Sequence, residues 1–366
     1  MEGLAGVVAG SSAICSVGTG AGLLYRGYPI EELARRAEFE EVAHLLLVGH
    51  LPTEHELKDF KQTLQEHREL PLVVKEVLQA LPISTHPMDV MKAGVVALGC
   101  ARPEALDFAN QEGCALQILG ALPAMLIYWH HYHKHGKQIP LSSKQSMAHY
   151  LLERLREEEP LEVEVKAMDA MLTLYAEHEF NASTYANRIT ASTLSDLYSC
   201  VSTGIGTLKG RLHGGANELA IAFILRFDSV SQALQEVDAL FAKKEKIMGF
   251  GHRIYKHADP RSAVGFELAK QLKHLGDPKL FEIALAIRDK VKQEKGLPDN
   301  IDFFGGLIYH YMRLERLYYT PFFVMSRAVG WMAHVFEQRA HNRIIRPTST
   351  YTGAPKRPFL PLQDRS

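Results

Sequence analysis

Apolar residues recur at every third or fourth position along most of this 366-residue chain, which is the spacing of one face of an α-helix. Thr53 and Glu56 form a capping-box pattern at the start of one such segment. Alternating β-branched residues are scarce, apart from a stretch at 18–28 that predicts a short hairpin. We therefore expect an all-α protein, with helices within these ranges: 29–70 (broken near Gly49 and Pro52), 104–133, 163–178, 232–242, 262–275 and 279–295.

Two segments interrupt this helical pattern. The polar stretch from His133 to Ser146 predicts a loop between helices. The tail after Arg346, with the sequence PTSTYTGAPKRPFLPLQ, contains too many prolines to stay helical. Because Tyr351, Phe359 and Leu360 lie among those prolines, we expect an ordered arm that lies on a surface, such as that of a partner subunit.

Composition narrows the class of protein. Apolar residues make up 46% and charged residues 23%, as in folded globular proteins. Lysine and arginine (41) balance aspartate and glutamate (42), and the net charge of −1 argues against binding nucleic acid or an anionic membrane. The chain shows no signal-peptide pattern and no run of about 18 apolar residues, so we expect a cytoplasmic protein without a membrane span. Four separated cysteines without a C-x-x-C pair predict no zinc site and no disulfide framework.

Histidine is unusually frequent, at 18 residues, and it exchanges protons near neutral pH. The segment WHHYHKH at 129–135 places His131 and His135 four apart, a spacing that suits two metal ligands on one helix face. It is the polar end of an amphipathic helix with no carboxylate or thiolate nearby in sequence, so we expect a solvated helix end and no metal site. The G-x-G-x-G pattern at 18–22 lacks the Rossmann spacing and context, which favours a flexible turn.

Three other segments carry residues that can move protons beside a carbonyl group. His213 precedes two glycines and a helix start, where the helix dipole favours a neutral imidazole that can donate to an enolate oxygen; the alternative is a capping histidine. His252 follows glycines and precedes Asp-Pro-Arg261, whose proline is expected to stiffen the arginine's loop and whose arginine suits a carboxylate. Asp302 opens the apolar stretch 303–311 and is either a general base or a helix cap.

Segments along the whole chain resemble the citrate synthase family, in the same order and at similar spacing. The most specific is GFGHRIYKHADPR, which contains His252 and ends at Arg261. The other matching segments are YRGY at 25–28, HEFNAS at 178–183, GRLHGGAN at 210–217, NIDF at 300–303, SRAVGW at 326–331 and IRP at 345–347.

This resemblance implies a homodimer that condenses oxaloacetate with acetyl-CoA and hydrolyses the resulting citryl-CoA without a metal. By motif match, Asp302 would remove a proton from the acetyl methyl group, and His213 would hydrogen-bond the thioester oxygen. His252 would polarise and protonate the oxaloacetate carbonyl as the carbon–carbon bond forms. Such help is needed because a thioester α-proton is too weakly acidic for a solvated carboxylate to remove.

The resemblance also assigns binding groups. The residues matched to the two carboxylates of oxaloacetate are His178, Arg261, Arg327 and Arg346, the last expected to come from the partner subunit. Lys256 matches a cation for the CoA phosphates, beside the backbone of 246–251 that includes Gly249 and Gly251. Coenzyme A enters as a thioester substrate, and no permanently bound cofactor is expected. The implied domains are a large one, 1–212 with 316–366, and a small one, 213–315.

Two departures from the family pattern flank the acyl site. Arg211 stands where proline is frequent, and Gly305-Gly306 stands where a serine is common. The main alternative is therefore 2-methylcitrate synthase, which uses propionyl-CoA, because one methylene is worth only about 1–3 kcal/mol in a pocket. Arg253, directly after His252, resembles the citrate enzymes more and favours acetyl-CoA.

An alternative of another class is a non-catalytic helical scaffold or a histidine-rich metal-binding protein. Either predicts the loss of a catalytic residue. His213, His252 and Asp302 are all present, which favours the enzyme.

Overall fold

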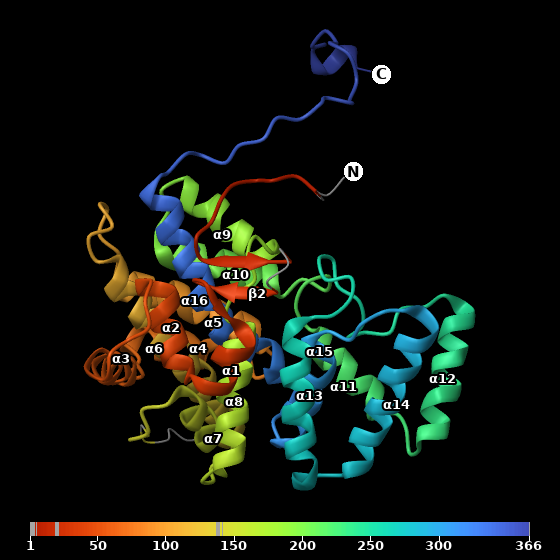
Figure 1. The fold of residues 1–366 in the computed structure, drawn as a ribbon. Coiled ribbons are helices and arrows are strands. Elements are labelled where there is room, and N and C mark those ends of the chain that lie inside the picture. The colour runs from red at the N-terminus through yellow and green to blue at the C-terminus, as the bar shows by residue number, and fades with distance from the viewer. Residues whose placement is uncertain (1–3, 5, 19–21, 137–139, 141, 366) are drawn as a thin grey trace.

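The computed structural model describes residues 4, 6–18, 22–136, 140 and 142–365 (Figure 1). Within them helices predominate, and the all-α prediction is confirmed. The α-helices are α1 (Ile30–Arg36), α2 (Phe39–Val48), α3 (Glu54–Glu66), α4 (Leu72–Ala80), α5 (Pro87–Ala101), α6 (Gln111–His135), α7 (Met147–Arg156), α8 (Glu162–Tyr175), α9 (Ala182–Ser192), α10 (Leu197–Leu208), α11 (Ala216–Ile224), α12 (Val230–Lys243), α13 (Pro260–Leu272), α14 (Pro278–Lys295), α15 (Ile301–Tyr311) and α16 (Tyr319–Ala340). Short 3-10 helices are η1 (Lys273–Leu275), η2 (Arg316–Tyr318) and η3 (Leu362–Asp364).

The N-terminal strands form a slightly larger unit than the predicted hairpin. Strands β1 (Cys15–Val17), β2 (Leu23–Tyr25) and β3 (Tyr28–Pro29) make a three-stranded antiparallel sheet in that order. The predicted turn at 18–22 falls largely on residues 19–21, which lie outside the described part of the chain.

Local capping signals fix several helix boundaries. The predicted capping box of α3 is present: the Thr53 side chain accepts from the Glu56 amide at 3.3 Å, and the Glu56 carboxylate accepts from the Thr53 amide at 2.7 Å. The helix predicted over 104–133 is wrong at its start, because α6 begins only at Gln111. Before it, the Asn110 side chain accepts from the amide of Ala105 at 2.7 Å and holds a turn there.

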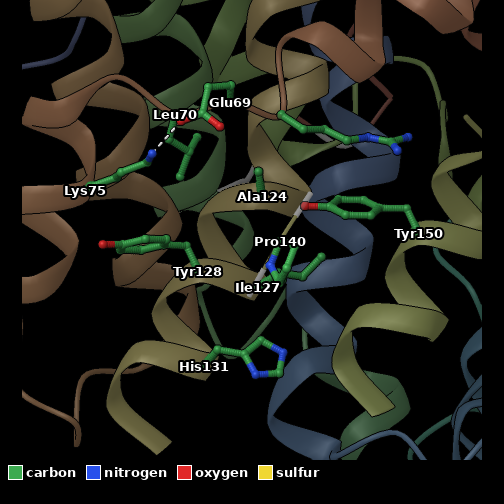
Figure 2. Close-up of a pocket in the computed structure, with 10 residues that line it drawn as sticks. Glu69, Leu70, Lys75, Ala124, Ile127, Tyr128, His131, Pro140 and Tyr150 are labelled. Carbon is green, nitrogen blue, oxygen red and sulfur yellow. Dashed lines mark hydrogen bonds and ion pairs between the residues drawn. The ribbon is translucent and has the colours of Figure 1, made fainter. Parts of the chain in front are cut away.

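The end of α6 also differs from the prediction. His130 and His131 are buried, whereas Lys134 and His135 are exposed, so only the last residues of the segment form the predicted solvated helix end. The apolar helices packed beside α6 enclose it, and His131 lines a small cavity of about 190 Å³ together with Tyr128 and Tyr150 (Figure 2). The predicted loop after α6 does separate two helices, since α7 begins at Met147 with Ser146 as its cap.

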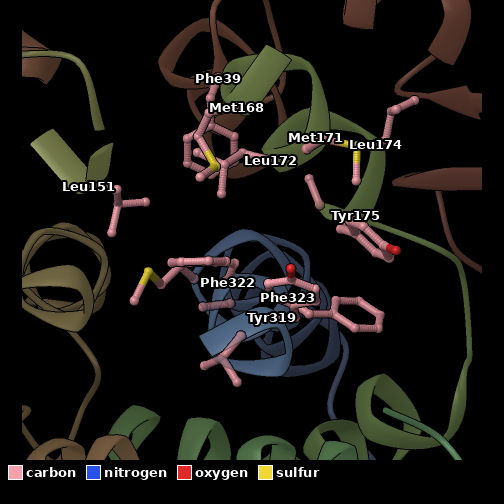
Figure 3. Packing of buried hydrophobic residues seen from close by; sticks show 14 of the residues in the cluster. Phe39, Leu151, Met168, Met171, Leu172, Leu174, Tyr175, Tyr319, Phe322 and Phe323 are labelled. Atoms are coloured by element: carbon pink, nitrogen blue, oxygen red, sulfur yellow. The ribbon is translucent and has the colours of Figure 1, made fainter. Parts of the chain in front are cut away.

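The core centres on α16, whose residues are buried from Tyr319 to Val335. Figure 3 shows Phe322 and Phe323 of this helix facing Met168 and Leu172 of α8. Among the described helices, α6 alone is long and apolar enough to cross a membrane. However, 78% of its most apolar window is buried inside the protein, as in a core helix.

Helices α11 to α15 gather on one side of the molecule (Figure 1). Within this group α13 and α11 pack on α15, and α12 packs on α14. Helix α13 also contacts α1 and α8, which joins the group to the remaining helices. Most segments that carry the predicted site residues lie along this junction, whereas Arg346 lies on the extended segment after α16.

The C-terminal segment after α16 runs away from the helices as an extended chain (Figure 1). Every residue from Arg346 to Arg365 is exposed. The arm predicted for this tail therefore covers no surface of its own subunit.

Candidate active site

Asp302 lies in the first turn of α15, and a neighbouring residue caps that helix. The Asn300 side chain accepts the amide of Asp302 at 3.1 Å, so the helix-cap alternative for Asp302 is wrong. One carboxylate oxygen of Asp302, Oδ1, accepts the hydroxyl of Tyr175 at 2.7 Å. Burial raises the pKa of Asp302, and the hydrogen bond from Tyr175 opposes that shift by favouring the charged form.

Tyr175 and Phe323 connect this carboxylate to the other side of the site. Tyr175 ends α8, and its ring centroid lies 4.5 Å from that of Phe323 on α16. The Phe323 ring in turn lies 6.4 Å from the His213 ring and 4.8 Å from the Arg327 guanidinium carbon. The chain thus brings α8, α15, α16 and the loop before α11 together at one place.

His213 precedes α11 but does not cap it, because Gly215 holds the cap position. The amide of Ser183 donates to Nε2 of His213 at 3.2 Å, and the Ser183 hydroxyl lies 2.8 Å from the same nitrogen. An amide can only donate, so Nε2 carries no proton and the ring proton sits on Nδ1. Burial, assisted by the charge of Arg327, lowers the pKa of His213 to about 4. The imidazole is therefore neutral at neutral pH.

His252 has the opposite tautomer. Its Nδ1 accepts the amides of Ile254 and Tyr255 at 3.2 and 3.3 Å, which leaves the ring proton on Nε2. Burial, with a further contribution from the charge of Arg261, lowers its pKa to about 4. The ring stacks on Tyr255 at 4.7 Å and meets the ring of His178 at 5.1 Å.

His178 is almost fully buried beside this pair. Its Nε2 lies 3.1 Å from the Tyr255 hydroxyl. Burial, followed by the positive charges of Arg261 and Arg327, lowers its pKa well below the usual value. His178 is therefore a neutral hydrogen-bonding group.

Arg261 lies in the first turn of α13 and not on a loop, because Asp259 caps this helix and Pro260 occupies its first position. Its Nε and Nη2 donate to the two carboxylate oxygens of Asp259 at 2.9 and 2.8 Å. Burial alone would lower the pKa of Arg261, but the Asp259 carboxylate outweighs it and raises the pKa. The ion pair fixes the direction of the guanidinium.

Arg327 is another buried cation of the site, 2% exposed. Its Nε donates to the carbonyl of Tyr175 at 2.7 Å. Within the described residues, no carboxylate lies at ion-pair distance from its guanidinium, in contrast to Arg261. A buried cation of this kind is a natural receptor for an anionic ligand.

Beside His213 a cavity of about 1050 Å³ reaches Phe241 near the end of α12 and the segment 244–251. Gly249 and Gly251 line it with φ angles of 90° and 75°, which favour glycine. A Cβ at Gly249 would lie 2.8 Å from Cβ of Phe303. The Gly251 amide donates to the carbonyl of Pro298 at 2.7 Å, so this segment is tied to the chain that leads into α15.

Basic side chains outnumber acidic ones around this cavity. The basic lining residues are Lys209, Arg211, Lys244, Lys246 and Lys295, against Glu218 and Glu245. Lys256, the cation taken from the resemblance, is exposed and is not among the lining residues of the described chain. Its ammonium donates to the carbonyl of Arg253 at 3.1 Å.

Arg346 is exposed and stands apart from the other predicted residues in this single chain. The amide before it, from Ile345, donates to the Ser192 hydroxyl at 3.0 Å at the end of α9. Ser183, which contacts His213, lies at the other end of α9, about 14 Å away at the usual helical rise.

Comparison with known proteins identifies the fold and the family. The family model described as "Citrate synthase, C-terminal domain" matches residues 3–348. The chain is 43% identical over 99% of its length to a 2-methylcitrate synthase of Shewanella oneidensis, of which 97% is covered. It is 38% identical over its full length to citrate synthase 2 of Bacillus subtilis, of which 99% is covered. The chain belongs to the citrate synthase family.

Solved structures of the citrate synthase family share this fold. A citrate synthase of Thermoplasma acidophilum, in a ternary complex with carboxymethyl coenzyme A and oxaloacetate, superposes with a TM-score of 0.90 at 31% identity, covering 99% of this chain and 98% of that one. The resemblance read from the sequence is confirmed, and the chain is an enzyme of this transferase family rather than a helical scaffold.

Sequence reasoning missed the residues that orient the proposed catalytic groups in this citrate synthase family member. Tyr175 fitted the apolar stripe of α8 and gave no separate signal. Ser183 lies in the quoted segment HEFNAS, but its contact with His213 depends on the tertiary fold. Trp331 likewise donates to the Ser183 hydroxyl oxygen at 3.0 Å from α16.

Proposed function

We propose that this enzyme is a citrate synthase that condenses acetyl-CoA with oxaloacetate and hydrolyses citryl-CoA to citrate and CoA. The observation that carries the proposal is the pair of neutral imidazoles with opposite tautomers, His213 with its proton on Nδ1 and His252 with its proton on Nε2, near the half-buried carboxylate of Asp302. This is the donor and base set that enolisation and carbonyl attack require.

In the first step Asp302 takes a proton from the acetyl methyl group. Its raised pKa makes it a stronger base than a solvated carboxylate. Nδ1–H of His213 donates to the thioester oxygen, where negative charge develops as the C–H bond breaks. Because His213 is neutral, it stabilises the enolate oxygen by a hydrogen bond and keeps its own proton.

In the second step the enolate carbon attacks the ketone carbon of oxaloacetate. Nε2–H of His252 donates to the ketone oxygen, which gains a proton as the new carbon–carbon bond forms. The backbone amides of Ile254 and Tyr255 hold the ring in the orientation that presents Nε2. Water then cleaves the thioester: its oxygen enters the new carboxylate and a proton passes to the CoA sulfur. The proton held by Asp302 replaces the one that His252 gave up.

Oxaloacetate carries two carboxylates, and buried cations match them. Arg327 offers a guanidinium without a carboxylate partner in the described chain, and Arg261 a guanidinium oriented by Asp259. His178 adds a neutral hydrogen-bonding group beside His252. Arginine suits this task because its planar fork binds both carboxylate oxygens.

The cavity of about 1050 Å³ is the proposed site for the CoA moiety. Its volume is at the upper end of the usual range for ligand pockets. The lysines that line it, with Lys246 beside Gly249 and Gly251, would face the CoA phosphates. Lys256 stays a candidate for the same role, at an exposed position.

The enzyme is proposed to act as a homodimer with shared active sites. Tyr351, Phe359 and Leu362 are 79%, 87% and 77% exposed on the extended tail, and such apolar groups call for a covering surface. A second copy would supply that surface, and its Arg346 would complete the oxaloacetate site. We also propose that residues 213–315 form the small domain and that the enzyme is cytoplasmic.

The second candidate function is 2-methylcitrate synthase, with propionyl-CoA in place of acetyl-CoA. The identity of 43% to the Shewanella oneidensis enzyme of that name, against 38% to the Bacillus subtilis citrate synthase, favours testing it. Gly305, near the base, packs tightly: a Cβ there would lie 3.0 Å from Cε of Met171 and 3.1 Å from the Tyr175 hydroxyl.

A side-by-side assay of acetyl-CoA and propionyl-CoA with oxaloacetate separates the two candidates. We expect a higher kcat/KM for acetyl-CoA. A large preference for propionyl-CoA would assign the chain to 2-methylcitrate synthase instead.

A further inference from the structure

Three histidines converge at the C-terminal end of α6, away from the catalytic groups. His130, His131 and His135 each offer one ring nitrogen within 4.8 Å of the other two. His130 and His131 are buried, and His135 is exposed. The catalytic proposal uses none of them.

A carboxylate reaches this cluster from a different helix. Glu157 follows the last residue of α7, with a left-handed φ of 56°. Its Oε1 lies 3.8 Å from Nδ1 of His131 and 4.0 Å from Nε2 of His135. The sequence analysis predicted no metal site because no carboxylate lies nearby in sequence. In the folded chain, Glu157 is such a carboxylate.

Hydrogen bonds orient two of the rings as metal ligands are commonly oriented. Nε2 of His131 lies 2.6 Å from the carbonyl of Arg154. A carbonyl only accepts, so Nε2 holds a proton, and in the neutral ring the lone pair on Nδ1 faces Glu157. Nδ1 of His130 is hydrogen-bonded to the Tyr318 hydroxyl, and when Nδ1 donates in this bond, Nε2 carries the lone pair for a metal ion. Ligating histidines usually bond their second nitrogen to such a carbonyl or side chain.

We propose that His130, His131, His135 and Glu157 form a binding site for a divalent cation of the zinc class. Imidazole nitrogens with one carboxylate suit zinc, cobalt or nickel, whereas magnesium and calcium prefer oxygen ligands. Zinc–nitrogen bonds of about 2.0–2.1 Å require the ligand atoms to approach further. His135 and Glu157 are exposed, so their side chains can rotate inward without repacking the core.

The charges around the site permit a cation. Lys134, on the same turn of α6, is ion-paired with Glu315. Arg154 lies 3.6 Å from the carboxylate of Glu153. His131 also borders the small cavity shown in Figure 2. The other described residues that line this cavity include Arg68 and the ion pair of Lys75 with Glu69, but no further imidazole and no thiolate. We therefore place the metal ligands in the histidine cluster with Glu157 and not in this cavity.

Such a cation has a structural role. It would join the end of α6 to the residue after α7, and Tyr318 links the cluster to η2, directly before α16. Binding to the folded state alone raises its stability by mass action. The prediction is a higher Tm in zinc, with no requirement for zinc in catalysis.

The test uses the full-length protein after dialysis against a chelator, with zinc titrated by calorimetry and followed by the shift in Tm. His135→Ala and Glu157→Gln alter exposed side chains and should fold. Each is expected to weaken zinc binding about tenfold or more, and to abolish the visible absorption of tetrahedral cobalt. The matched control is His133→Ala, because His133 points instead to the carbonyl of Leu78 at 3.1 Å.

Each variant is compared with its own zinc-free Tm, so a change in intrinsic stability does not confuse the result. The proposal holds if wild type and His133→Ala bind zinc alike while His135→Ala and Glu157→Gln lose affinity. It fails if wild type shows no zinc-dependent rise in Tm. It fails equally if all variants bind as wild type does, since zinc would then sit at other histidines.

Discussion

The hydroxyl of Tyr175 donates to Oδ1 of Asp302 at 2.7 Å, and this bond links the end of α8 to the start of α15. Burial raises the pKa of Asp302, and the bond from Tyr175 limits the rise by stabilising the carboxylate. The carbonyl of Tyr175 also accepts from Nε of Arg327 at 2.7 Å. One residue thus orients both the proposed base and a proposed substrate-binding cation.

Replacing Tyr175 by phenylalanine should shift the acid limb of activity. Tyr175→Phe removes a hydrogen bond to a charged group, worth about 1.5–3 kcal/mol, which corresponds to about 1–2 pKa units. We expect the acid limb of the kcat profile to move to higher pH, with the KM for oxaloacetate nearly unchanged. Tyr311→Phe is the control. Tyr311 lies on α15, as Asp302 does, but its hydroxyl donates to the carbonyl of Asp277 at 3.2 Å. An unshifted acid limb in Tyr175→Phe would refute this role.

Arg327→Lys should weaken oxaloacetate binding specifically. Lysine keeps the charge but loses the planar fork and the bond to Tyr175. We expect the KM for oxaloacetate to rise by about 10–100-fold, the equivalent of a charge-assisted hydrogen bond. Arg339→Lys is the matched control, because Arg339 is paired with Glu104 at 2.8 Å outside the site. Equal effects of the two substitutions on KM would argue against a binding role for Arg327.

Stability should fall as the solution becomes acidic. His213 and His252 have folded-state pKa values of about 4, below the ordinary 6.5, so the unfolded chain takes up more protons as pH falls from 6.5 to 4. The free energy of unfolding therefore decreases over this window. The raised pKa of Asp302 acts in the opposite direction near the acid end. Measured by thermal unfolding, the double variant His213→Asn, His252→Asn should lose less stability than wild type between pH 6.5 and 4.5; an equal loss would contradict the assignment.

Mixed subunits test whether Arg346 acts across a dimer. Arg346→Ala and Asp302→Ala should each be inactive alone. In a heterodimer of the two, one site would combine an intact Asp302 with an intact Arg346 from the other subunit. Co-expression of the two variants should restore activity to about a quarter of wild type. With random pairing, half of the dimers are heterodimers, and each heterodimer has one complete site out of two. Separable tags allow the heterodimer to be purified. No recovery in a purified heterodimer would place Arg346 outside the shared site.

The motifs could be recognised from sequence because they are local. His213 and His252 each stand among glycines within a few residues of their partners in the motif, and the period of 3.6 residues marked most helices. Asp302 was ambiguous until Asn300 was seen to cap α15. Residue spacing thus predicted the helices and the motifs, but not the role of Asp302.

The remaining features depend on contacts between distant parts of the chain. Tyr175 has the same pattern as a core residue, and only the packing of α8 on α16 and α15 brings its hydroxyl to Asp302. Glu157 meets the α6 histidines only because α7 ends beside them. The burial of His131 likewise depends on neighbouring helices, which the residue pattern of α6 alone does not show.

The most direct test of the proposed mechanism measures thiol release from acetyl-CoA in the presence and absence of oxaloacetate, for wild type and Asp302→Ala. Wild type should release CoA only when oxaloacetate is present. Asp302→Ala should lower kcat by about a thousandfold or more while the far-ultraviolet circular dichroism stays helical. Absence of oxaloacetate-dependent release in wild type, or undiminished turnover in Asp302→Ala, would contradict the account.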